Sequence, residues 1–252
     1  MKKEVGHNFL AKLGKKRLRP GGVVATNWLI RQAGITKNSH VLEVACNMCT
    51  TSIQLAKQYQ CHITGIDMDA KALTKARQNI KNANLEEYIH VQQANAMNLP
   101  FADASFDIVI NEAMLTMLNT AAKEKAVREY YRVLKPGGLL LTHDITFTKE
   151  HMHELLAELR ETIHVQVEPL PVPRWEELFS EIGFTKVAHE SGDMSLMKPT
   201  GLIRDEGIWG ALRIVKNGLK KENFPQFKKM YAFFNTSGKD LQYIAVCSRK
   251  PD

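Results

Sequence analysis

The residues with the clearest chemical potential are the acid Glu43 and the small residues that follow it. Glu43 lies inside the apolar run 41–44, where a buried carboxylate without a partner would be costly. The small residues 45–49 come next, and Thr50 and Thr51 then open a helical pattern. In nucleotide-binding α/β folds, a strand, a turn and a helix in this order direct backbone N–H groups toward the ligand. We therefore expect Glu43 to face a ligand or a helix N-terminus.

Further polar side chains stand where later apolar runs end. Asp67 closes the second such run, Asn111 and Glu112 follow the fourth, and His143 and Asp144 close the fifth. The carboxyl ends of parallel strands share one edge of a sheet. These side chains are therefore candidates for a common site at that edge.

The residues need a scaffold, and the spacing of apolar residues predicts one. Short apolar runs predict strands, whereas apolar residues spaced three or four apart predict helices. The strands are expected at 40–44, 63–67, 88–92, 106–110, 139–143, 185–190 and 241–248, and the intervening helices at 50–59, 69–83 and 121–134. Their alternation predicts an α/β fold with a parallel sheet and helices on both faces.

Both ends of the chain carry further helical patterns. The expected helices are 5–19, 23–33, 152–159, 175–182 and two within 203–235, with an extended linker at 169–173. In the first of the last two, apolar residues recur at Ile208, Leu212, Val215 and Leu219. We predict a single domain, 1–252, with an N-terminal helical cap at 1–34, a core at 35–146 and a second half at 147–252 that holds the insertion 203–235.

Composition bounds the class of protein. The chain has 252 residues, 44% of them hydrophobic, which is enough to bury a substantial core. No apolar run approaches the roughly 18–20 residues that span a bilayer, and the N-terminus lacks the apolar segment of a signal peptide. Four cysteines in a chain of this length do not indicate a disulfide framework. We expect a cytoplasmic protein.

The net charge of +7 is concentrated in the first 20 residues. They hold seven Lys or Arg against Glu4 alone, which leaves about +1 for the rest of the chain. Such an arm suits nucleic acid or an anionic substrate. Phe9 is the one aromatic residue among these basic residues, so a solvated terminal helix is the simpler interpretation.

Cys46 and Cys49 form a Cys-x-x-Cys pair, a spacing that also suits a redox or metal site. No second Cys or His pair at zinc spacing accompanies it, since Cys61 and Cys247 are isolated. We predict no metal site and interpret Cys46 and Cys49 as small buried side chains, with redox chemistry as the alternative.

Four motifs stand in the order and spacing of the class I S-adenosylmethionine-dependent methyltransferases. They are Val41-Leu42-Glu43-Val44-Ala45-Cys46, Gly65-Ile66-Asp67-Met68-Asp69, Asn98-Leu99-Pro100-Phe101 with Ser105-Phe106-Asp107, and Arg132-Val133-Leu134-Lys135-Pro136-Gly137-Gly138. Residues 39–146 resemble this family, and look closest to its type 11 small-molecule members, which include quinone and sterol methylases. The resemblance implies a Rossmann-like, doubly wound, mostly parallel sheet of seven strands. It also implies S-adenosylmethionine as cofactor and S-adenosylhomocysteine as product.

The resemblance implies roles at the matching positions. The implied cofactor-binding residues are Glu43 for the methionyl ammonium, Ala45, Cys46, Asn47 and Thr51 for its carboxylate, Asp67 for the ribose hydroxyls, Met68 for the adenine face, Asn95 and Ala96 for the adenine edge, and Asn111 beside the sulfonium. Glu112, His143 and Asp144 are the candidates for a catalytic base, which in-line methyl transfer needs when the acceptor is protonated.

The loop departs from the family's acidic-x-Gly-x-Gly-x-Gly pattern, because Ala45, Asn47 and Cys49 stand in place of the glycines. Glycine permits a positive φ and a close approach of the backbone. Asn47 tolerates a left-handed conformation better than most residues. Cys49 is the harder substitution, since its side chain is expected to press on the methionyl group.

We expect an S-adenosylmethionine-dependent methyltransferase that acts on a small-molecule acceptor. Two alternatives stay open: a catalytically degenerate member that serves as a binding protein, and an RNA methyltransferase that uses the basic arm. The sequence Asn111-Glu112-Ala113-Met114 stands where nucleobase amino methylases carry an Asn-Pro-Pro-Tyr-type segment, which disfavours nucleic acid as the acceptor. The oligomeric state is not indicated by the sequence.

Overall fold

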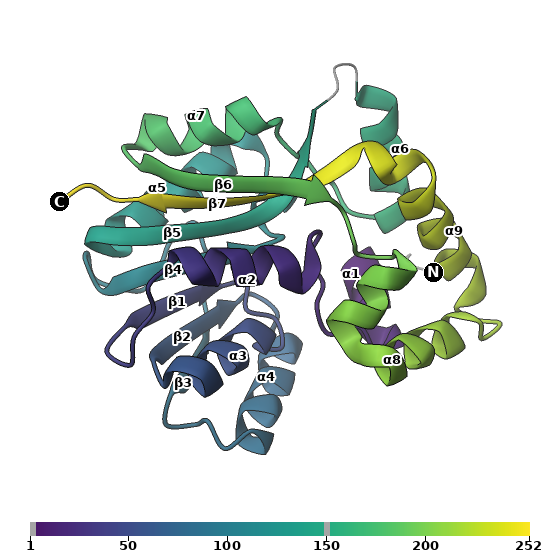
Figure 1. Cartoon of the computed structure of the whole chain (residues 1–252), viewed down its shortest axis with the longest axis horizontal. Helices are drawn as coiled ribbons and strands as arrows, with labels where there is room; N and C mark the ends of the chain where they lie inside the picture. Colours follow the sequence, from purple (N-terminus) through teal and green to yellow (C-terminus); the bar gives the residue numbers. More distant parts are fainter. Residues whose placement is uncertain (1–3, 149–151) are drawn as a thin grey trace.

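A seven-stranded sheet forms the centre of the computed structural model, which describes residues 4–148 and 152–252 (Figure 1). The strands are β1 (His40–Val44), β2 (His62–Asp67), β3 (Ile89–Gln93), β4 (Phe106–Glu112), β5 (Leu134–Phe147), β6 (Thr185–Asp193) and β7 (Leu241–Arg249). Their order across the sheet is β3-β2-β1-β4-β5-β7-β6. β7 runs antiparallel to β5 and β6, whereas the other pairs are parallel. The predicted Rossmann-like, mostly parallel sheet of seven strands is confirmed.

Alternating side chains of the strands build a core on each face of the sheet. Val41 and Ile63 face the helices α2 (Gly22–Gln32), α3 (Thr50–Tyr59) and α4 (Ala70–Asn82). Leu42 and Ile66 face α5 (Thr120–Val133) and α7 (Val172–Ile182) on the other side. The central strands are mostly apolar because both of their faces are covered, and their buried polar residues gather toward the carboxyl ends.

A third core joins four helices beyond one end of the sheet. These helices are α1 (Gly6–Leu13), α6 (His153–Ile163), α8 (Pro199–Gly218) and α9 (Phe224–Asn235). Phe9, Leu159 and Met230 are among the buried side chains that they share. Figure 1 shows the four helices gathered on one side, with α1 against α8. Two 3-10 turns, η1 (Leu115–Met117) and η2 (Ser237–Asp240), complete the described elements.

Several boundaries differ from the predicted ones, and three of the differences have a clear local cause. α1 ends at Leu13 instead of residue 19, because Gly14 takes a left-handed conformation with φ 108° and closes the helix. β5 includes Pro136-Gly137-Gly138, since its pairing with β4 continues across a register shift instead of breaking there. α7 begins inside the predicted linker, with Pro173 in the first turn, where the missing N–H of proline costs no helical hydrogen bond.

The strand order reverses between β1 and β4. β1 pairs with β2 on one side and with β4 on the other. In doubly wound sheets, ligands bind in the crevice outside the carboxyl ends of the strands at such a point. Glu43, Asp67 and Glu112 stand near the ends of these three strands, so the fold brings the predicted acids to one place.

Candidate active site

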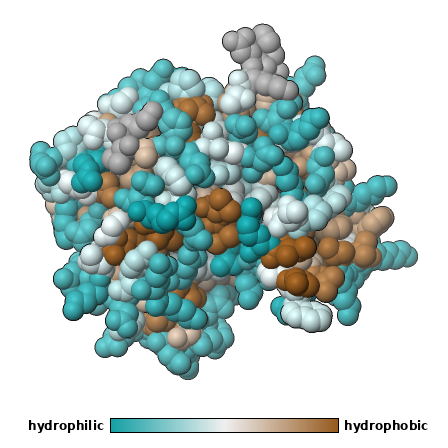
Figure 2. Space-filling model, in the orientation of Figure 1, coloured by the Kyte–Doolittle hydropathy of each residue, from teal (hydrophilic) through white to brown (hydrophobic). Residues whose placement is uncertain are grey.

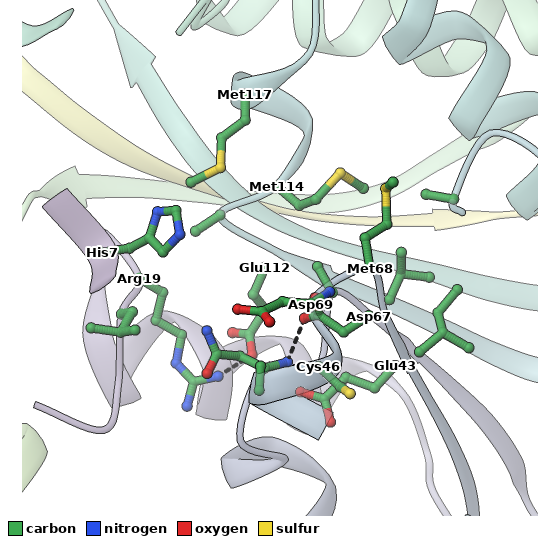
Figure 3. A pocket seen from close by; sticks show the side chains of 18 of the residues that line it. His7, Arg19, Glu43, Cys46, Asp67, Met68, Asp69, Glu112, Met114 and Met117 are labelled. Atoms are coloured by element: carbon green, nitrogen blue, oxygen red, sulfur yellow. Dashed lines mark hydrogen bonds and ion pairs between the residues drawn. The ribbon is translucent and has the colours of Figure 1, made fainter. Parts of the chain in front are cut away.

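A cavity of about 310 Å³ lies at the carboxyl ends of β1, β2 and β4. Glu43, Asp67 and Glu112 line it, together with residues of the N-terminal arm, the segment 4–21 that precedes α2. Figure 3 shows the acids and Arg19 on one side, and Met68, Met114 and Met117 on the other. The cavity therefore joins a charged half to an apolar half, and its volume falls in the range of small-molecule pockets.

The loop 45–49 takes a glycine-like shape without glycine. The φ angles of Ala45, Asn47 and Cys49 are 56°, 48° and 57°, all in the left-handed region. The Asn47 N–H donates to Asp67 Oδ2 at 2.9 Å and so fixes the middle of the loop. The Cys49 side chain is fully buried in the core shared by α2, α3 and α4, away from the cavity. The steric conflict expected from Cys49 is therefore relieved by the direction of its side chain.

Glu43 meets the start of α3 from inside the sheet. Its Oε2 accepts the Ser52 N–H at 2.9 Å and also the Ser52 hydroxyl. Burial raises the pKa of Glu43 to about 7, although the hydrogen bonds from Ser52 act in the opposite direction. A cation in the cavity would restore the ionised form. Glu43 thus accepts hydrogen bonds from a helix N-terminus, as expected, and it also lines the cavity in which a ligand could bind.

Arg19 brings a buried positive charge from the N-terminal arm into the same site. Its Nη1 donates to Glu112 Oε2 and to the Thr51 hydroxyl. Its Nε and Nη2 are buried and have no hydrogen-bond partner among the described residues. Because the Arg19 side chain lines the cavity, these two nitrogens suit an anionic group of a ligand.

Glu112 is the centre of a hydrogen-bond network. Its Oε2 also accepts the Thr51 hydroxyl at 2.7 Å, and its Oε1 accepts the Thr26 hydroxyl and lies 3.0 Å from His143 Nδ1. Burial alone would raise the pKa of Glu112, but Arg19 and His143 lower it to about 2. A carboxylate with this pKa takes up no proton at neutral pH. Glu112 is therefore held as an ionised, hydrogen-bonded carboxylate, and its role as a catalytic base stays a prediction.

His143 and Asp144 are also held by internal contacts. His143 Nε2 accepts the Gly21 N–H at 2.9 Å, which leaves Nδ1 protonated and donating to Glu112. Asp144 accepts the backbone N–H groups of Thr116 at 3.1 Å and Ile145 at 2.8 Å. Both side chains are fully buried outside the lining of the larger cavity, although Asp144 lines a second, smaller cavity, and their role as a base for the methyl acceptor stays a prediction.

Most of the predicted cofactor-binding residues do line the larger cavity. They are Glu43, Ala45, Cys46, Asn47, Asp67, Met68, Asn95 and Ala96. Thr51 is instead fully buried against Arg19 and Glu112. Asn111 is also buried, and its Nδ2 donates to the Thr142 hydroxyl at 3.0 Å. Successive side chains of a strand point to opposite faces, so Asn111 turns away from the side to which Glu112 points.

His7, which the sequence did not single out, lies between this cavity and a smaller one of about 70 Å³. Leu18, Ala113 and Met117 also line both cavities, so the two are neighbours. Burial lowers the pKa of His7, against the attraction of Asp67 and Asp69. Its Nδ1 is buried without a hydrogen-bond partner among the described residues. A neutral imidazole in this position can accept a hydrogen bond or a proton.

Two basic residues of the N-terminal arm, Lys15 and Arg19, are buried inside the protein, whereas Lys12 and Lys16 are exposed. Lys15 is fully buried, with its Nζ 3.5 Å from Asp205 and 3.7 Å from Glu206 in α8. The backbone N–H groups of Lys16 and Arg17 both donate to Glu206 at 2.9 Å. Lys2 and Lys3 lie outside the described residues. An arm held in this way fits a cover over the cavity better than a solvated RNA-binding surface.

The Cys46 and Cys49 thiols are free and buried. A hydrogen bond with Cys49, together with burial, raises the pKa of Cys46. Redox chemistry needs a thiolate that is stable near neutral pH. The surroundings of the pair therefore favour the interpretation as packed side chains.

Comparison with known proteins places this geometry in a family. A family profile described as "Methyltransferase domain" matches residues 41–138, from β1 into β5. In fold, the chain is similar to the phosphoethanolamine N-methyltransferase 2 of Haemonchus contortus, with a TM-score of 0.77 at 17% identity over 98% of this chain and 58% of that one. Residues 41–138 thus match a methyltransferase domain, and the chain as a whole has the fold of solved methyltransferases.

Sequence relatives of this methyltransferase fold agree. A demethylmenaquinone methyltransferase from Lactiplantibacillus plantarum is 35% identical over 112 residues, which are 44% of this chain and 46% of that protein. An uncharacterized protein of Haemophilus influenzae is 57% identical over 249 residues, 99% of both chains. The similarity to this demethylmenaquinone methyltransferase thus covers less than half of either chain.

Proposed function

We propose that the chain transfers a methyl group from S-adenosylmethionine to a small, largely apolar acceptor. The observation that carries the proposal is the buried Glu43 carboxyl group on a cavity that Arg19 also lines, with two buried Arg19 nitrogens that have no hydrogen-bond partner among the described residues. An amino-acid group carries one positive and one negative charge. Glu43 suits its ammonium, and Arg19 and the N–H groups at the start of α3 suit its carboxylate.

The other end of the cavity suits a nucleoside. Asp67 Oδ1 and Oδ2 each accept one backbone N–H at 2.9 Å, from Asp69 and Asn47. An ionised carboxylate has further lone pairs, which two ribose hydroxyls can use. Met68 is 65% exposed on the cavity wall, where it can cover an adenine ring beside Asn95. The Haemonchus contortus structure was solved with S-adenosylhomocysteine, which supports the same cofactor here.

The smaller apolar cavity suits the methyl acceptor. A bound S-adenosylmethionine would supply a methyl group carried on a positively charged sulfur. An acceptor nucleophile would bond to the methyl carbon while the carbon–sulfur bond breaks, and the sulfur would leave as a neutral thioether. His7 would accept the proton of an acceptor hydroxyl at the junction of the two cavities. The cavity of about 70 Å³ is smaller than the roughly 150 Å³ that holds a benzene ring. Met117, Met194 and Met230 in its wall are flexible enough to admit a larger group.

Transfer itself is tested with S-adenosylmethionine labelled in its methyl group. The protein is incubated with fractions of a bacterial small-molecule extract, and label is counted in the organic phase. We expect label in at least one apolar fraction, and suppression of that signal by S-adenosylhomocysteine. Cofactor binding without transfer to any fraction would instead identify a binding protein, and label in added RNA would identify a nucleic-acid acceptor.

Replacing Glu43 with glutamine is expected to remove a pH dependence from cofactor binding. In the wild type, the pKa of Glu43 is raised to about 7, so the carboxyl group is mostly protonated below that pH and cannot pair with the ammonium. Affinity for S-adenosylhomocysteine should therefore rise as the pH increases through 7, by up to about tenfold per unit on the acid side. Calorimetry over this pH range measures the change.

Adenosine provides the matched control for the Glu43→Gln experiment. It carries the ribose and the adenine but no ammonium, so its affinity should be independent of both pH and the Glu43 substitution. A wild-type affinity for S-adenosylhomocysteine that stays flat from about pH 6 to 8 would show that Glu43 does not face the ammonium.

A further inference from the structure

An apolar stripe of α8 faces solvent. Gly207, with φ 73°, kinks this helix, and the residues that follow are unusually exposed for their type. Trp209 is 81% exposed, Ile208 63% and Leu212 55%. Figure 2 shows apolar side chains gathered over the position of α8 at the right of the view. The periodic apolar residues that predicted this helix therefore point mostly outward.

A neighbouring side of α8 is firmly packed. Ala211, Ile214 and Gly218 are buried in the core shared with α1 and α9. Gly218 touches Phe227 so closely that a Cβ would lie 2.5 Å from its ring. Asn217 Nδ2 donates to the Leu13 carbonyl oxygen at 3.0 Å. The helix is thus rigidly attached, and the exposed stripe is its free side.

The exposed side of α8 is also basic. Residues 208–221 hold four basic residues and no acid; the basic residues are Arg213, Lys216, Lys220 and Lys221. All four are exposed. Trp209, Arg213 and Lys216 recur at spacings of four and three residues, so they share one side of the helix beside the apolar stripe, and Lys220 and Lys221 follow directly after the end of the helix. Exposed Phe224 and Lys228 of α9 extend the same composition.

We propose that α8 docks on an anionic lipid surface. A helix that presents Trp and Leu beside Lys and Arg lies in the interface of a bilayer, with its apolar side among the acyl chains and its cations at the phosphates. A second copy of this chain fits the surface less well, because it would bring four more cations against the same four. No helix of residues 4–148 and 152–252 is long and apolar enough to cross a membrane, so α8 lies on the surface.

The proposed surface is linked to the N-terminal arm. Asp205 and Glu206 stand just before the kink and hold Lys15, Lys16 and Arg17. The same arm lines the larger cavity through Lys16, Leu18 and Arg19. Docking would therefore hold the N-terminal arm, which covers the cavity, close to the lipid surface. The proposal itself does not depend on the reaction that the cavity performs.

Vesicle binding of the full chain tests the proposal. Vesicles of phosphatidylcholine alone are compared with vesicles of equimolar phosphatidylcholine and phosphatidylglycerol, by flotation and by tryptophan fluorescence. We expect binding to the anionic vesicles, a fluorescence shift to shorter wavelength that Trp209→Ser removes, and weaker binding as salt is raised. The double variant Lys216→Glu with Lys220→Glu should bind at least about thirtyfold more weakly, because it removes two cations and adds two anions.

Matched variants test whether vesicle binding depends on this surface or on the overall charge and hydrophobicity of the protein. Lys75→Glu with Lys81→Glu makes the same change in net charge at exposed sites of α4, and Val24→Ser removes an exposed apolar side chain of α2. Both should bind vesicles like the wild type. Equal binding to neutral and anionic vesicles, or no binding to either, would overturn the proposal. A dimer in lipid-free solution that Leu212→Ser dissociates would assign the stripe to a second copy and also overturn it.

Discussion

Replacing Asp67 with alanine is expected to weaken the binding of S-adenosylhomocysteine by about 100-fold. The Asp67 carboxylate would accept hydrogen bonds from both ribose hydroxyls, and charge-assisted hydrogen bonds of this kind contribute about 1.5–3 kcal/mol each. A loss of about 3 kcal/mol corresponds to two decades in the dissociation constant. The same substitution also removes the acceptor of the Asn47 N–H, which frees the loop that supports the ligand. Calorimetric titration measures the effect.

Two ligands and two variants separate the role of Asp67 from a general loss of structure. Asp67→Ala should weaken adenosine as well as S-adenosylhomocysteine, because both carry the ribose. Glu43→Gln should weaken only S-adenosylhomocysteine, because adenosine lacks the ammonium. Equal affinities of wild type and Asp67→Ala for adenosine would remove Asp67 from the ribose site.

Replacing Arg19 with methionine is expected to lower the free energy of unfolding by about 3–5 kcal/mol at neutral pH. Arg19 and Glu112 form a buried ion pair, with side chains 6% and 8% exposed, and the substitution leaves the Glu112 carboxylate without its cation. The double variant Arg19→Met with Glu112→Gln should recover most of the loss, because it buries no unpaired charge. Urea unfolding of the four proteins completes the cycle.

The loss of unfolding free energy caused by Arg19→Met should depend on pH. In the wild type, the pKa of Glu112 is lowered from 4.5 to about 2, so its ionisation adds stability above pH 4.5 that is lost as the pH falls through 2. Without Arg19 that contribution disappears, so the deficit should be largest at neutral pH and shrink toward about pH 4. Arg174→Ala, which breaks an exposed ion pair with Glu177, should cost under about 1 kcal/mol. A deficit of that size for Arg19→Met would show that the buried pair is not important for stability.

The sequence predicted the parts of the site that lie close together along the chain. β1 and α3 have the predicted bounds, and Glu43, the loop and Asp67 stand on one cavity as expected. The reason is that a strand, a turn and a helix are set by local spacing. The alternation of β4 sends Asn111 and Glu112 to opposite faces, so Asn111 is buried against Thr142, and its place beside the sulfonium stays a prediction.

The parts that could not be predicted depend on contacts between distant segments. The backbone of Lys16 binds Glu206, which lies 190 residues away, and no local pattern marks such a pair. His7 reaches the site only because α1 packs with α6 and α8. The apolar spacing in α8 predicted a helix, but periodicity does not say whether an apolar side faces a core or the solvent.

The most direct measurement is a calorimetric titration of the wild-type chain with S-adenosylmethionine and S-adenosylhomocysteine. We predict one site per chain and a dissociation constant in the micromolar range, which corresponds to a binding free energy of about −8 kcal/mol. Asp67→Ala should weaken this affinity by about 100-fold. Absence of binding at millimolar concentrations of both ligands would contradict the proposed cofactor, whatever the result of the vesicle experiment.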